Sequence, residues 1–191
     1  MKLSPRDAAA YFRKPDTTKA GLLIYGQDGM RVALRRQEVI KALTGENAEE
    51  EMRLTRLQGA DIRKDPATLA DALKAQGCFP GPRVVFLEDA TDSVTDACKN
   101  ALSDWRPDAA HLVVTAGQLN ARSSLRKLFE SAPNALCAAI YDDPPSREEI
   151  ERTLSEKGLT NIDRPAMADL EALARALDPG DEPIAVRTPR R

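Results

Sequence analysis

Short, predominantly apolar segments recur along this chain, and segments of helical spacing separate them. Four of them read GLLIY, VVFL, HLVVT and LCAAIY, at residues 21–25, 84–87, 111–115 and 136–141. Short strands that are apolar along nearly their whole length, without alternation, are typically buried on both faces, as in parallel sheets covered by helices. A fifth strand is predicted at 52–57, where MRLTRL alternates as an edge strand or a strand with one solvated face does. The sequence therefore predicts an α/β fold with a five-stranded parallel sheet sandwiched by helices.

The connecting segments carry helix signals. Residues 30–43 place apolar side chains on one stripe, and Gly45 ends that helix. The pair Asp65-Pro66 opens a helix that is predicted to reach Gln76 and to be closed by Gly77. The other helices of this part are predicted at 5–12, where Ser4 is the cap and Pro5 the first residue, and at 91–102 and 121–130.

The alternation of strands and helices ends after residues 142–145, which read DDPP. Ser146 and Glu149 form a capping box for a helix that runs to about Lys157, and a second helix is predicted at 166–177. No strand follows, and the last residues, EPIAVRTPRR, have no periodicity. We therefore expect an α/β domain at 1–143, a small helical part at 144–181 and a disordered tail at 182–191.

Composition argues against several classes of protein. The net charge of −2 gives no global field that favours nucleic acid or an anionic membrane. No apolar run approaches the roughly 18 residues of a membrane span, and the charged N-terminus has no apolar core of a secretory signal. Cys78, Cys98 and Cys137 are far apart and form no C-x-x-C pair, so they predict free buried thiols rather than a disulfide frame or a zinc site. We expect a cytoplasmic protein that contacts no membrane.

The first strand and the helix after it have the layout of a phosphate-binding loop. A working loop reads G-x-x-x-x-G-K-[ST], where Lys neutralises the phosphate and Ser or Thr holds magnesium. Gly21 and Gly26 keep the glycine spacing, but they flank a strand, and Gln27-Asp28 stands where Lys-Ser would be. Asp28 would also repel a triphosphate. The sequence predicts a degenerate loop at Gly26, Gln27, Asp28 and Gly29 that binds no cofactor.

Two further positions resemble catalytic or metal-binding residues. Glu88-Asp89 follows VVFL as the magnesium-binding acids of P-loop ATPases follow their strand, but without a phosphate loop the metal has no triphosphate to bridge. We interpret the pair as the turn that ends a strand. His111 is the single histidine, and one histidine without a carboxylate or nucleophile nearby predicts a structural role. No catalytic residue and no metal site is therefore predicted.

Arg122, Arg126 and Lys127 form a basic cluster on the helix that Asn120 or a nearby serine caps. The cluster is either a solvated helix face or a contact for phosphate or an acidic partner.

The segment QGCFPGPR, residues 76–83, joins a helix to a buried strand. Its two prolines and two glycines indicate a rigid loop, and Phe79 lies among them. The loop either presents Phe79 as an interaction tip or folds Phe79 down to plug one end of the sheet. These residues leave both interpretations open.

Several segments, in order, resemble one known family. AGLLIYGQDGMRVALRR, ALKAQGCFPGPRVVFLEDA, LVVTAGQLNARSSLRKLFE and AAIYDD are similar to segments of the delta subunit of the bacterial DNA polymerase III clamp loader. The resemblance covers about residues 1–181. It implies a RecA/AAA+-like fold with a degenerate, non-hydrolysing nucleotide site and a helical lid domain, of which 144–181 would be a part.

The resemblance also implies a binding function. Family members open the ring-shaped sliding clamp, and they grip it with a hydrophobic pair that matches Cys78 and Phe79 here. The first residue of the pair is often Leu, so the smaller Cys78 would leave Phe79 as the main anchor. The implied partners are the sliding clamp, the other clamp-loader subunits and, through their complex, DNA. The family belongs to a DNA polymerase holoenzyme, but no intrinsic catalysis is expected of this chain.

The chain departs from the family at its end, where the helical collar that builds the pentameric loader does not follow. Assembly with other loader subunits is therefore expected to be weakened or lost, while clamp contact would survive. Two alternatives remain. One is an atypical P-loop or AAA+ ATPase, and the other is a non-catalytic α/β domain that binds a protein through Arg122, Arg126 and Lys127.

Overall fold

The computed structural model describes residues 1–141, 147–156, 158–159 and 162–176. It divides into two compact units, Met1–Tyr141 and Asp142–Arg191, each taken by itself below. The predicted cap at Ser146, the helix ends at Lys157 and Leu177, and the tail at 182–191 lie outside the described residues.

The first unit contains one five-stranded sheet, and every strand pair in it is parallel. The strand order is β2-β3-β4-β1-β5, so β1 lies between β4 and β5, and β2 is an edge strand. The predicted five-stranded parallel α/β sheet is confirmed. Its strands are β1 Gly21–Gly26, β2 Leu54–Gln58, β3 Val84–Glu88, β4 His111–Ala116 and β5 Ala135–Ile140.

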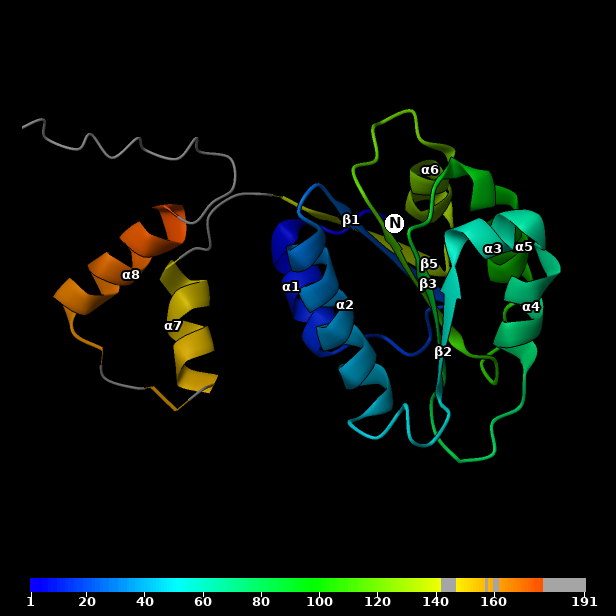
Figure 1. Ribbon diagram of the computed structural model, residues 1–191, viewed down its shortest axis with the longest axis horizontal. Helices are drawn as coiled ribbons and strands as arrows, with labels where there is room; N and C mark the ends of the chain where they lie inside the picture. The colour runs from blue at the N-terminus through cyan, green and yellow to red at the C-terminus, as the bar shows by residue number, and fades with distance from the viewer. Residues whose placement is uncertain (142–146, 157, 160–161, 177–191) are drawn as a thin grey trace, which may run out of the picture. The chain divides into compact units, whose positions relative to one another are not determined.

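Helices cover both faces of this sheet (Figure 1). α1 and α2 lie on one face, and the helices that connect β2 to β3, β3 to β4 and β4 to β5 lie on the other (Figure 1). This division follows from right-handed crossovers between parallel strands. The chain crosses the sheet in one direction from β1 to β2 and in the opposite direction from β2 through β3 and β4 to β5, so the connecting helices lie on opposite faces. The helices are α1 Pro5–Arg13, α2 Gly29–Thr44, α3 Gly59–Lys64, α4 Ala67–Lys74, α5 Thr95–Asp104 and α6 Ser124–Ser131, with a 3₁₀ turn at Asp92–Val94.

Two apolar layers hold the sheet between its helices. Leu22 and Ile24 of β1 pack in the layer with α1 and α2, whereas Leu23 and Tyr25 pack in the layer with α4, α5 and α6. Alternate residues of one strand thus serve opposite layers, as the pleat requires. Phe129 of α6 is fully buried, which shows how completely the helices close this face.

Several predicted boundaries were wrong by a few residues. β2 begins at Leu54 rather than Met52, because Met52 lies in a turn with φ of 50°. α4 ends at Lys74, short of Gln76, and the short helix α3 was not predicted. α6 begins at Ser124 and its cap is Ser123, whose hydroxyl accepts a hydrogen bond from the Arg126 amide.

The described part of the second unit consists of two helices, α7 Arg147–Glu156 and α8 Arg164–Ala176. Arg147 connects them, because its Nε lies 2.8 Å from Glu151 Oε1 on its own helix and 3.8 Å from Glu171 Oε1 on α8. In the described residues of the whole chain, no helix combines the length and the apolar character needed to span a membrane.

Gly26 and Gly29 have different roles, although the sequence suggested one glycine turn for both. Neither has the positive φ that favours glycine. A Cβ on Gly26 would lie 2.6 Å from the main-chain oxygen of Ile140 in β5, whereas a Cβ on Gly29 would have no atom within 4 Å. Gly26 is therefore needed for the close approach of β1 and β5, and Gly29 is not.

Gly26→Ala is expected to destabilise the fold by about 2 kcal/mol, because a strand backbone rather than a flexible side chain would have to move. Gly29→Ala is the matched control, and we expect it to be neutral or to stabilise by up to about 1 kcal/mol, since alanine is the better helix former. Urea unfolding of the two variants measures both effects. Equal stabilities of the two variants would contradict the distinction.

Candidate functional site

The carboxyl edge of the sheet holds the loop that resembled a phosphate site. Asp28 is the N-cap of α2, and its Oδ1 accepts hydrogen bonds from the amides of Met30 at 2.8 Å and Arg31 at 3.1 Å. Amides at a helix N-terminus are the groups that bind phosphate in nucleotide sites. In this chain the Asp28 carboxylate already accepts hydrogen bonds from two of these amides. Asp28 therefore opposes phosphate binding in two ways, by using the amide donors that a phosphate would need and by its negative charge.

The same carboxylate also has a cationic partner. Arg31 Nε lies 3.2 Å from Asp28 Oδ2, and Arg31 Nη1 donates to the main-chain oxygen of Tyr141. A phosphate group at this helix end would have to displace Asp28 from both the amides and Arg31. The geometry fits the predicted degenerate loop.

Glu88, which follows VVFL in the manner of a magnesium-binding acid, also has protein partners. Arg36 Nη1 lies 3.4 Å from Glu88 Oε1, and Gln58 Nε2 donates to Glu88 Oε2 at 3.0 Å. Arg36 in turn stacks on the ring of Phe86, 4.7 Å from its centroid. Through these contacts Glu88 connects the end of β3 to Arg36 of α2 and to Gln58 of the edge strand β2. They support the interpretation of Glu88 as an acid that ends a strand. Across the described residues, no group of three or more His, Cys, Asp or Glu side chains is placed to hold a metal ion.

His111 has the contacts of a structural histidine. It is buried at the start of β4, and its Nδ1 lies 2.9 Å from the main-chain oxygen of Lys19. The ring of Trp105 lies against it, with the ring centroids 5.8 Å apart. These contacts fix one end of the central strand.

The basic cluster, with Arg122 just before α6 and Arg126 and Lys127 on it, is only partly available to a partner. Arg126 Nε lies 2.8 Å from Glu130 Oε1, and its guanidinium faces the ring of Tyr25. Burial raises the pKa of Tyr25 to about 12, so Tyr25 stays neutral beside this cation. Arg122 and Lys127 are exposed. Of the three cations that the sequence groups together, Arg122 and Lys127 are thus the exposed pair, whichever of the two interpretations holds.

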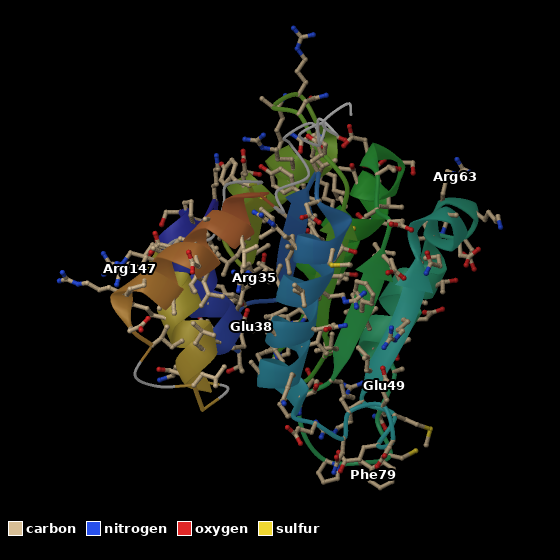
Figure 2. All side chains as sticks on the ribbon, turned by 60° about the vertical axis from the view of Figure 1, so that its left-hand side comes forward. Arg35, Glu38, Glu49, Arg63, Phe79 and Arg147 are labelled. Carbon is tan, nitrogen blue, oxygen red and sulfur yellow. The ribbon has the colours of Figure 1, made fainter. Side chains whose placement is uncertain are left out.

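The loop that carries Cys78 and Phe79 lies at the opposite edge of the sheet, since residues 75–83 join the end of α4 to the start of β3. Figure 2 shows Phe79 at the end of the first unit beyond the carboxyl-terminal end of α2, on a loop that projects from that unit. Phe79 is 45% exposed, and Cys78 beside it is exposed as well. The side chain therefore does not plug the sheet, and of the two interpretations the projecting tip fits the structure.

Two residues near this loop were missed by sequence reasoning. Met52 is 65% exposed, although it was assigned to a strand. Arg53 occupies a polar position of the predicted alternation, which implied a solvated side chain, yet it is only 9% exposed. The sequence does not indicate that Arg53 is buried, because its burial arises from the loop that packs over it.

The three cysteines have different environments. Cys98 and Cys137 are buried, as expected, and burial raises the pKa of each thiol to about 12. Cys78 is exposed, so the expectation of three buried thiols was wrong for this residue. The reason is that α4 ends before Cys78, which places it on the projecting loop instead of on a packed helix face.

One thiol is expected to react with an aromatic disulfide reagent in the native protein at about pH 8, and three in denaturant. The thiolate is the reactive form, and burial removes it from Cys98 and Cys137. Cys78→Ser should abolish the fast native reaction without changing the slow remainder. Two or more fast thiols in the native protein would contradict the assignment.

The chain was compared with known proteins, and neither a family model nor a curated protein matches it. Solved structures do match. The DNA clamp loader delta protein of Bacillus subtilis is similar with a TM-score of 0.58 at 14% identity, over 90% of this chain and 52% of that one. A DNA polymerase III gamma subunit-related protein of Thermotoga maritima follows with a TM-score of 0.46 at 15% identity, over 82% and 54% of the two chains.

The likeness to the clamp loader structure concerns the fold. It shows that the chain shares the fold of that protein, a parallel five-stranded sheet between layers of helices. The chain spans about half the length of that clamp loader protein.

Calorimetric titration with Mg-ATP tests the carboxyl edge. We expect no saturable heat from the wild type, because the Asp28 carboxylate holds the amides that a phosphate needs. Asp28→Ala frees these amides, and weak heat that appears in this variant alone would identify the carboxylate as the block. Saturable binding by the wild type in the micromolar range would contradict the prediction and favour an atypical ATPase.

Proposed function

We propose that this chain is a clamp-loader subunit of the delta type, which binds the sliding clamp through Phe79 and does not hydrolyse ATP itself. The observation that carries the proposal is the exposed phenylalanine on the loop before β3, at the position where the resemblance places the clamp contact. The clamp-loader-like fold supports it.

The chemistry of the Phe79 loop is that of binding. An aromatic side chain that inserts into an apolar pocket is the residue type that dominates protein interfaces, at about 2 kcal/mol or more on truncation. Cys78 offers a smaller apolar surface beside it. No nucleophile or general base needs to be invoked for such a contact.

Clamp opening then follows from differential affinity. If the Phe79 loop binds the open ring more tightly than the closed ring, binding shifts the ring toward the open form by the difference in free energy. This step consumes no ATP on the chain itself. The engaged carboxylates at the other edge, Asp28 and Glu88, are consistent with a subunit whose ATP-dependent steps are supplied by partners.

Partners beyond the clamp are proposed on the same basis. Association with other clamp-loader subunits, indirect contact with DNA through their complex, and action in the cytoplasm are the setting in which such a subunit would work. The likeness covers about half of the clamp loader protein, so these contacts need not all lie on this chain.

Phe79→Ala is expected to weaken binding to the cognate sliding clamp by about 30-fold, the equivalent of about 2 kcal/mol. The loss would come from the apolar contact rather than from the fold, because Phe79 is half exposed. Calorimetry or surface plasmon resonance with purified clamp measures the affinity, and circular dichroism checks the fold.

Met30→Ala is the matched control. Met30 is 74% exposed and lies on the first turn of α2, at the carboxyl edge of the sheet, away from the Phe79 loop. Its truncation should leave clamp affinity unchanged. Equal affinities of wild type and Phe79→Ala, or equal losses in both variants, would refute the assignment of Phe79.

A further inference from the structure

Arg53 joins two loops at the amino edge of the sheet. Its amide donates to the main-chain oxygen of Ala48 at 2.7 Å, which closes the turn before β2, and its own oxygen accepts from the amide of Val84 at 2.8 Å. The residue therefore lies between the turn that contains Met52 and the start of β3. Its main chain is fixed on both sides.

The side chain of Arg53 is nine-tenths buried, which for an arginine requires partners for its donors. Its Nε donates to Glu51 Oε2 at 2.7 Å and its Nη2 to the same oxygen at 2.5 Å. Its Nη1 donates to the main-chain oxygen of Pro82 at 3.1 Å. Glu51 thus neutralises the guanidinium while the third nitrogen holds the Phe79 loop.

Gly81 completes this contact. It has φ of 122°, a conformation that L side chains rarely adopt. A Cβ at this position would also lie 3.2 Å from Arg53 Nη1 and 3.5 Å from Arg53 Cζ, so the guanidinium packs against the glycine backbone. The loop therefore has a glycine where the arginine passes, two residues after Phe79.

We propose that Arg53 is a positioning residue that fixes the Phe79 loop in its projecting conformation and so prepares it for its partner. Residues 75–83 contain no helix or strand, and a main-chain bond from the His111 amide to the Arg83 oxygen, at 2.8 Å, holds only the end of the arm that follows Phe79, so side-chain contacts complete its anchoring. Arg53 binds this arm at Pro82, and Arg83 Nη2 binds the Asp108 main-chain oxygen at 2.6 Å. A loop that is already ordered loses less conformational freedom on binding. The consequence for clamp affinity rests on the proposed function, whereas the ordering of the loop does not.

Lysine would not replace Arg53. The planar guanidinium directs its donors to Glu51 and Pro82 at the same time, whereas an ammonium group is a point charge on a flexible stem. Arg53→Lys keeps the charge and is therefore expected to loosen the loop nearly as much as Arg53→Gln.

Arg56 provides a matched control. It lies on β2, pairs with Glu49 through an exposed ion pair, and has no bond to residues 75–83 among its described contacts. Its side chain is 55% exposed, in contrast to the 10% of Arg53. Arg56→Gln removes an arginine–glutamate pair from the same segment without touching the Phe79 loop.

The first measurement is the mobility of a nitroxide label on Cys78, the exposed thiol next to Phe79. In the full chain, Arg53→Gln and Arg53→Lys should narrow the electron paramagnetic resonance spectrum of the label relative to wild type and Arg56→Gln, with the far-ultraviolet circular dichroism unchanged. A spectrum that Arg53→Gln does not alter would overturn the positioning role. A variant that fails to fold is replaced by Gly81→Ala, which breaks the same contact from the loop side and should give the same narrowing.

The second measurement is clamp affinity of the unlabelled variants. Arg53→Gln should weaken binding about tenfold, less than Phe79→Ala, and Arg56→Gln should leave it unchanged. The effect of positioning on binding is refuted if Phe79→Ala loses binding while Arg53→Gln, in which the spin label shows a mobile loop, binds the clamp as tightly as wild type. If neither Phe79→Ala nor Arg53→Gln changes affinity but the label becomes mobile, the proposed function fails and the positioning role stands.

Discussion

The pairing of β1 between β4 and β5 is the constraint on which the rest of this structure depends. Gly26 permits it, because any larger residue would meet the main chain of β5. Because β1 lies between β4 and β5 and every strand pair is parallel, the carboxyl ends of all five strands meet at one edge of the sheet and their amino ends at the other. The start of α2 with Asp28 therefore lies at the carboxyl edge, and the loop with Phe79, which precedes β3, lies at the amino edge.

This separation has a functional consequence. Ligands of open parallel sheets bind at the carboxyl edge, where the strand order reverses between β1 and β4. In this chain the groups at that edge bind one another, since Asp28 occupies the amides of α2 and Glu88 binds Arg36 and Gln58. Changes at this edge need not disturb the opposite one. A fold of this kind can lose nucleotide chemistry and still present an interaction loop on a rigid sheet.

The sequence was sufficient to predict the strands of the sheet but not the conformations of the loops, and the reason is physical. Buried strands such as HLVVT and VVFL are specified by solvent exclusion, which acts on every residue of the segment and leaves a pattern. Asp28 was recognised as the wrong residue for a phosphate loop, but its hydrogen bonds to the amides of Met30 and Arg31 depend on the exact turn geometry. The start of β2 was misplaced because Met52 fits the alternation while its backbone adopts a left-handed turn. Arg53 looked like a solvated residue because its partner Pro82 is remote in sequence.

In the role proposed for it, Arg53 would also explain how a loop without secondary structure can make a specific contact. A phenylalanine on a freely moving loop would lose much of its binding free energy to ordering. The contact from Arg53 to Pro82 and the close packing on Gly81 order the loop during folding, when Glu51 compensates the buried charge. A buried guanidinium with a missing partner is energetically costly. The two contacts of Arg53 are therefore cooperative, so that loss of Glu51 would weaken the contact with Pro82, and loss of the Pro82 contact would weaken the ion pair with Glu51. On this proposal the turn before β2 would set the rigidity of Phe79 without itself touching the partner.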